Sequence, residues 1–118
     1  MMRLDVDFSF CCAHDLPNYD GVCHRLHGHQ YKMRISVSGK VDPVTGFVAD
    51  FEAIKRIVTE EILALVDHRY LNEIEGLSNP TAENMAILFW NKLKEPLPGL
   101  CEIRLWETPE YSVSYTGE

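Results

Sequence analysis

Apolar and polar residues alternate along residues 4–14, which is the pattern of a β-strand with one buried face. The apolar side of this run consists of Leu4, Val6, Phe8, Phe10, Cys12 and His14. A turn-rich loop follows at 15–21, and a second alternating run covers 27–39. On its apolar side this run carries His27, His29, Tyr31, Met33, Ile35 and Val37. The pattern predicts two long strands, each with histidine at one end of its apolar face.

Two later segments carry apolar residues at helical spacing. The first covers residues 50 to about 66, and the second ends near residue 94. The start of the second helix has two interpretations. Either Asn79 is the cap with Pro80 at the first helical position, or Thr81 is the cap.

The last part of the chain predicts two strands, over 100–107 and 111–116, joined by a short turn at Pro109. The order of elements is then ββααββ, an α+β fold with both helices on one face of an antiparallel sheet. A chain of 118 residues has room for one core, so residues 1–118 are expected to form a single domain. Four strands leave two unpaired sheet edges, which small proteins often pair between subunits. We therefore expect a homo-oligomer.

The chain is acidic, with a formal net charge of −7 at pH 7. Nucleic acid is therefore not an expected partner, because such binding needs cations that neutralise phosphates. The apolar stretches are too short to cross a membrane, so no membrane partner is expected. The first residues lack the apolar core of a signal peptide, and a cytoplasmic location is expected.

In that compartment the four cysteines are expected to be free thiols, namely Cys11, Cys12, Cys23 and Cys101. The adjacent pair Cys11 and Cys12 is interpreted as packed small residues, since free cysteine is commonly buried. Cys23 differs, because its neighbours are polar and it lies in an expected loop.

Three histidines form a candidate metal site. His27 and His29 leave the same face of one strand, and His14 joins them from the neighbouring strand. Three imidazoles with an open fourth position are typical of catalytic zinc. Iron is the alternative, because Asp15 or Asp20 could supply the carboxylate that such iron sites use.

Further residues suggest acid–base chemistry. Cys23 precedes His27 by four residues, which places a thiol beside the open metal position. Asp67-His68 ends the first predicted helix. It is either a cationic histidine stabilised by the helix dipole or an acid/base pair in which the carboxylate orients the imidazole.

Glu107 lies on the core-facing side of its predicted strand, where a carboxylate is costly unless something binds it. Two adjacent N–H donors on a guanine-like or pterin ring would satisfy it in bidentate fashion. The alternative is that Glu107 simply lies in water past the end of the sheet.

Several motifs occur together and in a fixed order along nearly the whole chain. They are Cys23-x-x-x-His27-Gly28-His29, the turn 41–46, Asp67-His68-x-x-Leu71-Asn72, Asn79-Pro80-Thr81-x-Glu83 and Glu107-Thr108. In this combination the chain resembles the 6-pyruvoyltetrahydropterin synthase family, and most closely its bacterial carboxy-forming branch. Gln30, where the animal enzymes usually carry asparagine, also favours the bacterial branch.

The resemblance implies the tunnelling fold (T-fold), in which ββααββ subunits form a barrel, commonly as hexamers of two trimers with active sites between subunits. By the same resemblance, the Zn²⁺ ligands are His14, His27 and His29. Cys23 is implied as the base, with Asp67 and His68 as its relay partners. Glu107 is implied as the anchor of the pterin ring, with Thr81 and Thr108 as secondary pterin contacts.

The implied reaction is that of a zinc-dependent lyase in queuosine biosynthesis. It converts 7,8-dihydroneopterin triphosphate to 6-carboxytetrahydropterin, acetaldehyde and triphosphate. Two alternatives stay open: the pyruvoyl-forming synthase, which eliminates triphosphate without losing carbons, and a non-catalytic pterin- or purine-binding module. A triphosphate is an unusual ligand for an acidic chain, and only a local cluster such as His24, Arg25 and Lys32 could offset the charge.

Overall fold

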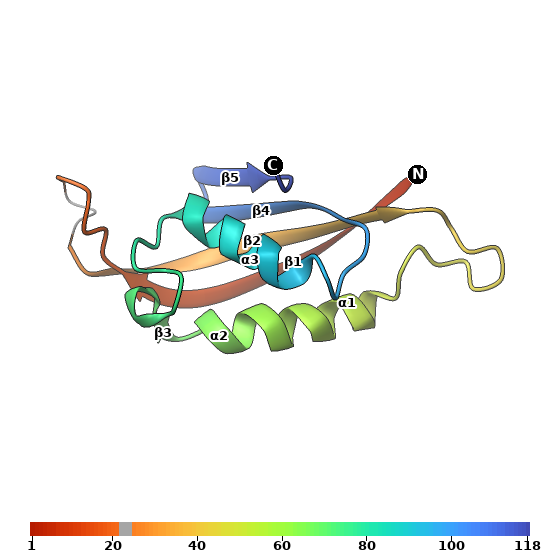
Figure 1. The fold of residues 1–118 in the computed structure, drawn as a ribbon, viewed down its shortest axis with the longest axis horizontal. Helices are drawn as coiled ribbons and strands as arrows, with labels where there is room; N and C mark the ends of the chain where they lie inside the picture. Colours follow the sequence, from red (N-terminus) through yellow and green to blue (C-terminus); the bar gives the residue numbers. More distant parts are fainter. Residues whose placement is uncertain (22–24) are drawn as a thin grey trace.

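Two long antiparallel strands form the centre of the sheet (Figure 1). In the computed structural model, which describes residues 1–21 and 25–118, β1 (Met2–His14) pairs with β2 (His27–Gly39) along its whole length. The register places His14 opposite His27 at one end of this ribbon. Both strands predicted from the alternating pattern are confirmed, and their histidine-bearing ends meet.

The other side of β2 pairs with β4 (Leu100–Thr108), which in turn pairs with β5 (Tyr111–Tyr115). The two final strands thus lie within one residue of their predicted bounds. Pairing between β2 and β4 ends at Lys32 and Trp106. Within the described part of the chain, the first residues of β2 therefore have no strand beside them on that side.

A fifth strand was not predicted. β3 (Arg69–Tyr70) pairs parallel to β1 at Cys12 and Ala13, which gives the sheet order β3-β1-β2-β4-β5. The expectation of a purely antiparallel four-stranded sheet is wrong at this edge. A strand of two residues is too short to show an alternating pattern. Its pairing depends instead on the path that the chain takes after the preceding helix.

The first predicted helix is present but is not uniformly α-helical. It consists of α1 (Phe51–Val58), a π-helical turn η2 (Thr59–Leu63) and α2 (Ala64–Val66). Its buried residues recur at every fourth position, namely Ile54, Val58, Ile62 and Val66. A four-residue step drifts by about 40° in a helix of 3.6 residues per turn. The wider π turn compensates for this drift and keeps the buried residues facing the sheet.

The second predicted helix is α3 (Ala82–Leu93), and its cap is Thr81. The Thr81 side chain accepts a hydrogen bond from the backbone N–H of Asn84 at 3.1 Å. The alternative cap, Asn79 with Pro80 at the first helical position, is therefore wrong. A single turn of 3₁₀ helix, η3 (Leu71–Glu73), lies between β3 and α3.

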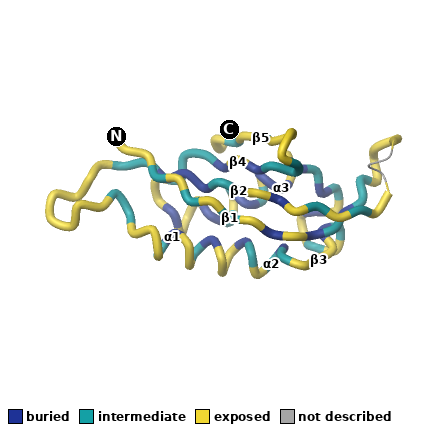
Figure 2. Tube along the Cα trace, turned by 180° about the vertical axis from the view of Figure 1, so that it is seen from behind, coloured by how far each residue is buried: buried dark blue, intermediate teal, exposed yellow. Residues whose placement is uncertain are grey.

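Among the described residues, the helices pack on one face of the sheet and leave its other face uncovered (Figures 1 and 2). The core lies between these layers and includes Phe10, Tyr31, Met33, Ile35, Phe89, Ile103 and Leu105. Cys12 is buried in it, whereas Cys11 points to the uncovered face and is exposed. The expectation that both cysteines are packed is thus wrong for Cys11. None of the helices in the described ranges is long and apolar enough to cross a bilayer.

Candidate metal centre and substrate cleft

The three predicted metal ligands lie together at the paired ends of β1 and β2. The ring centroids of His14 and His27 are 4.5 Å apart, and those of His27 and His29 are 4.6 Å apart. His14 is fully buried, whereas the other two imidazoles are half-buried. One ligand atom from each histidine and one from Glu107 all lie within 4.8 Å of one another. The cluster is therefore compact enough to hold a single ion.

Backbone carbonyls fix the orientation of two of these rings. His14 Nδ1–H donates to the carbonyl of Pro80 at 2.9 Å, and His27 Nδ1–H donates to the carbonyl of Arg25 at 2.6 Å. Each neutral ring then presents a lone pair on Nε2, yet the two Nε2 atoms are only 3.0 Å apart. Two lone pairs at this distance repel unless a cation lies between them. Donation from the far ring nitrogen is also the usual support of a metal-bound histidine.

The third imidazole gives independent evidence for a bound cation. His29 Nε2 is buried and makes no hydrogen bond within the described residues. Glu107 Oε1 lies 3.0 Å away, close enough for an ion pair but not placed for a hydrogen bond. Burial lowers the pKa of both His14 and His29 and favours their neutral, metal-binding form. The residues present therefore fit a metal ion.

The carboxylate in this cluster is not one of the two considered from the sequence. Asp15 accepts a hydrogen bond from the Tyr70 hydroxyl at 2.5 Å, and neither Asp15 nor Asp20 belongs to the cluster. Glu107 is the acidic member instead. Three imidazoles with a carboxylate form a nitrogen and oxygen donor set that zinc accepts readily.

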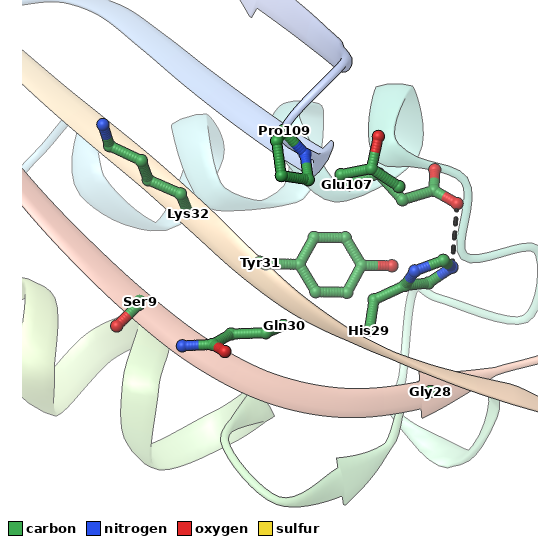
Figure 3. A pocket seen from close by; sticks show the side chains of 9 residues that line it. Ser9, Gly28, His29, Gln30, Tyr31, Lys32, Glu107 and Pro109 are labelled. Atoms are coloured by element: carbon green, nitrogen blue, oxygen red, sulfur yellow. Dashed lines mark ion pairs between the residues drawn. The ribbon is translucent and has the colours of Figure 1, made fainter.

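Glu107 connects the cluster to a cleft (Figure 3). Its side chain is 24% exposed, so the alternative in which it lies in water past the sheet is wrong. The cleft has a volume of about 520 Å³ and opens where β2 and β4 cease to pair. Its lining includes His29, Tyr31, Lys32, Glu107 and Thr108. Pockets for small ligands are commonly of this size.

Both predicted threonine contacts have backbone hydrogen bonds already. Thr108 Oγ1 accepts from the N–H groups of Glu110 and Tyr111, each at 3.2 Å, while the residue also lines the cleft. Thr81 Oγ1 caps α3, as described above. These hydrogen bonds fix the orientation of both hydroxyl groups. Thr81 stabilises the start of α3, and Thr108 stabilises the turn between β4 and β5.

Asp67 and His68 form the expected carboxylate–imidazole pair, with Asp67 Oδ1 3.1 Å from His68 Nδ1. Backbone hydrogen bonds from strand β1 fix the position of this pair. The backbone N–H of Cys11 donates to Asp67 Oδ1 at 3.0 Å, and the backbone N–H of His68 donates to the carbonyl of Cys11 at 2.6 Å. His68 has a φ of 60°, a left-handed conformation that is uncommon outside glycine. The imidazole is 80% exposed and therefore accessible from outside the subunit.

A second cleft, of about 590 Å³, lies beside this pair. Its lining includes both His68 and His29, together with Cys11 and Tyr70. Cys23, the predicted base, belongs to residues 22–24, which lie outside the described part of the chain.

Sequence reasoning missed two groups at the centre. The Tyr31 hydroxyl lies 3.3 Å from His14 Nδ1, and burial raises the pKa of this tyrosine. Tyr31 shares a strand face with His29, so the alternating pattern contained a signal for it. The carbonyl of Pro80 gave no such signal, because only folding brings it next to β1.

Known proteins similar to this chain are tetrahydropterin synthases. The sequence matches the model of the 6-pyruvoyl tetrahydropterin synthase family over residues 3–118. The 6-carboxy-5,6,7,8-tetrahydropterin synthase of Synechocystis sp. is 37% identical over 114 residues, which cover 92% of this chain and 88% of the relative. The Haemophilus influenzae protein of the same name is 34% identical over 139 residues, covering 98% and 99%.

A solved structure supports the same relationship. Caenorhabditis elegans 6-pyruvoyl tetrahydropterin synthase matches with a TM-score of 0.91 and 30% identity, covering 99% of this chain and 96% of that one. The 6-pyruvoyl tetrahydrobiopterin synthase of Poecilia reticulata is 37% identical over 97 residues, covering 78% of this chain and 66% of the relative. The resemblance and the tunnelling fold predicted from the motifs are thus confirmed, and the chain belongs to the 6-pyruvoyl tetrahydropterin synthase family of enzymes.

Proposed function

We propose that this protein is a 6-carboxytetrahydropterin synthase that converts 7,8-dihydroneopterin triphosphate to 6-carboxytetrahydropterin, acetaldehyde and triphosphate. The observation that carries the proposal is the convergence of three imidazoles and Glu107 in one cluster, two members of which, His29 and Glu107, line a cleft. Support for the carboxy-forming branch comes from the bacterial relatives of that name, which align over most of both chains. The product would enter queuosine biosynthesis.

The ion proposed for the centre is zinc, held by His14, His27 and His29. The facing lone pairs of His14 and His27 and the unpartnered His29 Nε2 support this choice. When bound, zinc supplies Lewis-acid stabilisation for charge that develops on the side-chain oxygens of the substrate. Pro80 and Arg25 contribute through their carbonyls, which hold two of the rings in their metal-binding orientation.

Glu107 is proposed to anchor the pterin ring by accepting hydrogen bonds from two adjacent ring N–H groups. Its position at the junction of cluster and cleft supports this role, because one carboxylate oxygen already faces His29. A partly buried carboxylate without a strong donor is poorly solvated, and a bidentate donor pair on the substrate would compensate for that loss. Thr108 lines the same cleft and is proposed as a secondary contact, with Thr81.

Proton transfer is proposed to involve Cys23 as the base, with Asp67 and His68 as its relay. Asp67 orients the imidazole through Nδ1, which leaves Nε2 to accept or donate a proton. The high exposure of His68 supports an active site between subunits, in which this imidazole meets a cysteine of a neighbouring copy.

Such a site requires an oligomer, and we propose a homohexamer of two trimers. Two sheet edges support assembly: β5 is the last strand on one side, and β3 covers only two residues of β1 on the other. The free thiols of Cys11, Cys12 and Cys101 are compatible with the proposed location in the reducing cytoplasm.

The decisive experiment is incubation of the zinc-loaded protein with dihydroneopterin triphosphate, followed by mass spectrometry of the products. Carboxytetrahydropterin with acetaldehyde is expected, and both should disappear in Cys23→Ala and in metal-stripped protein. Pyruvoyltetrahydropterin alone would support the second candidate, which the Poecilia relative favours. Binding of substrate without turnover would contradict both enzyme assignments and favour a non-catalytic pterin-binding module.

A further inference from the structure

Three cations surround a single indole ring on the uncovered face of the sheet. Lys32 Nζ lies 4.8 Å from the centre of the Trp106 ring. The guanidinium carbons of Arg34 and Arg104 lie 5.4 and 5.1 Å from it. We call these four residues the cation cluster. Cations at such distances are attracted to the indole face, which also restricts the motion of their side chains.

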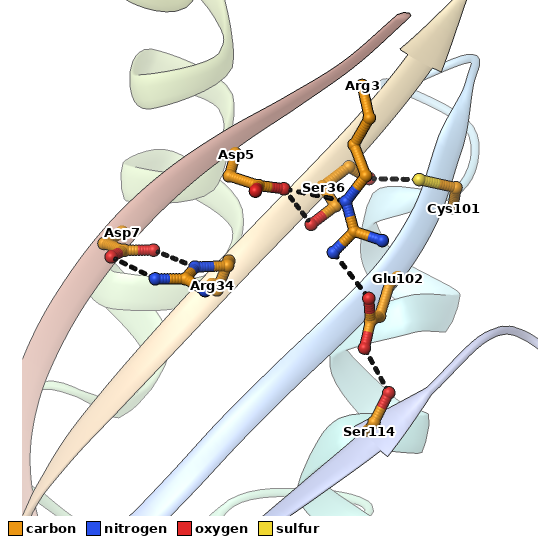
Figure 4. Close-up of polar contacts among 8 residues, drawn as sticks. All are labelled: Arg3, Asp5, Asp7, Arg34, Ser36, Cys101, Glu102 and Ser114. Carbon is orange, nitrogen blue, oxygen red and sulfur yellow. Dashed lines mark hydrogen bonds and ion pairs between the residues drawn. The ribbon is translucent and has the colours of Figure 1, made fainter. Parts of the chain in front are cut away.

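The cation cluster carries more positive than negative charge. Arg34 and Arg104 lie directly opposite each other on β2 and β4, an arrangement of like charges that destabilises a sheet. Asp7 compensates in part, because it binds Arg34 at 2.7 and 3.0 Å (Figure 4). It also lies 3.7 Å from Lys32 Nζ. Arg104 donates to the Ser112 hydroxyl at 3.2 Å, and its charge is one of the causes that lower the pKa of Glu102.

The charge balance is reversed further along the same face, toward the start of β1. Arg3 binds Asp5 at 2.9 Å and Glu102 at 2.6 Å, so that one cation meets two carboxylates (Figure 4). Positive charge is thus concentrated at the cation cluster, in a chain whose formal net charge is −7. Such an excess is expected where a protein binds an anion.

The cation cluster adjoins the proposed active site. Lys32 lines the 520 Å³ cleft together with His29 and Glu107 (Figure 3). A neighbouring cleft of about 270 Å³ is lined by Lys32, Trp106 and Thr108. Lys32 lies three residues from His29 on β2, about 10 Å along the strand and on the opposite face of the sheet. The cleft opens at the edge of β2 and is lined by both residues. The two clefts share Lys32 and Thr108, so a molecule bound at Glu107 could extend to Lys32 and Trp106, against which the two arginines lie.

We propose that Lys32, Arg34 and Arg104 bind the triphosphate group of the substrate, with Trp106 holding their side chains in place. This inference rests on the proposed function, because that substrate supplies the triphosphate. Arginine matches phosphate oxygens in bidentate fashion, and lysine adds a mobile point charge. The sequence pointed to His24, Arg25 and Lys32 for this task. Lys32 belongs to the cation cluster, Arg25 does not, and His24 lies outside the described residues.

The test uses inorganic tripolyphosphate as the probe and calorimetric titration of the zinc-loaded protein. Arg104→Gln and Lys32→Gln are each expected to weaken its binding about tenfold, the loss typical of one charge-assisted contact. Lys55→Gln removes the same charge from exposed α1 on the other side of the sheet and should bind like the parent protein. Equal binding by all four proteins would overturn the proposal.

Steady-state kinetics separate this inference from the proposed function. In Arg104→Gln, the KM for the triphosphate substrate should rise about tenfold, while affinity for unphosphorylated dihydroneopterin stays unchanged. Turnover with an unaltered KM in both cluster variants would overturn the inference and leave the function standing. Cluster-dependent binding of tripolyphosphate without any pterin turnover would support the anion site and refute the function. Metal content and circular dichroism verify that each variant is folded.

Discussion

Glu107 Oε1 lies 3.0 Å from His29 Nε2, so a single carboxylate contacts both the metal cluster and the substrate cleft. This contact allows two roles, a fourth metal ligand or an acceptor for the ring of the substrate. Three imidazoles already make a complete ligand set for a catalytic zinc, whose fourth position stays open. The second role is therefore favoured, and the two roles differ in what a neutral side chain at this position would do.

Replacing Glu107 by glutamine should leave the metal in place and weaken pterin binding. An amide keeps the size of the carboxylate but accepts one N–H instead of two, so dihydroneopterin is expected to bind about 10- to 100-fold more weakly. Metal content by mass spectrometry and fluorescence titration with dihydroneopterin measure the two effects. Loss of the metal from Glu107→Gln would instead identify Glu107 as a ligand.

Replacing His27 by alanine should abolish tight metal binding, because this imidazole is one of the three proposed nitrogen ligands. In the parent protein, zinc at 100 times its dissociation constant is expected to stabilise the fold by about 2.7 kcal/mol. Thermal unfolding with and without added zinc should show this gain in the parent and not in His27→Ala. The control is His68→Ala, which removes an exposed imidazole from outside the cluster. An equal gain in both variants would show that the ion binds elsewhere.

The strand pairing and the histidine cluster could be predicted because successive side chains of a β-strand alternate between its two faces. Alternation places His14 on one apolar face and His27 and His29 on another, and antiparallel pairing brings the two strand ends together. The contact between Glu107 and His29 was not predictable in the same way. It depends on how far β4 follows β2 before their pairing ends, which is a property of the folded sheet.

Two other features could not be predicted from the sequence, because they also depend on contacts made in the folded chain. The parallel pairing of β3 with β1 follows the left-handed backbone conformation of His68. A histidine in the sequence gives no indication of this conformation. The cation cluster arises from cross-strand neighbours such as Lys32 and Trp106, which are 74 positions apart in the chain. Local pattern thus predicted the faces of the elements, while contacts between distant strands required the structure.

Replacing Asp67 by asparagine tests the proposed relay. The amide oxygen can still accept the hydrogen bond from the Cys11 backbone, but the negative charge that supports an imidazolium on His68 is lost. We expect kcat to fall by about 10²- to 10⁴-fold, the range typical of a general acid–base group, with the fold retained. Steady-state kinetics with 7,8-dihydroneopterin triphosphate measure kcat, and circular dichroism verifies the fold.

Asp42→Asn is the matched control for this change. Asp42 also accepts backbone hydrogen bonds, from Val44 and Thr45 at 2.7 and 3.1 Å, in a turn after β2. Its substitution removes a carboxylate with a similar backbone role outside the cluster and both clefts that border it. If Asp67→Asn and Asp42→Asn retained the same kcat, Asp67 would have only a structural role.

The two adjacent cysteines of β1 should differ sharply in reactivity. Burial raises the pKa of the Cys12 thiol to about 12, whereas Cys11 is exposed on the uncovered face. At pH 8 only about one in ten thousand Cys12 side chains is then a thiolate, the form that reacts with iodoacetamide. Peptide mapping after mild alkylation should find Cys11 modified and Cys12 intact until urea unfolds the chain. Cys11→Ser provides the control, since this substitution should remove the modification that occurs before unfolding. Modification of Cys12 at the rate of Cys11 would contradict the prediction and show that this end of the core opens in solution.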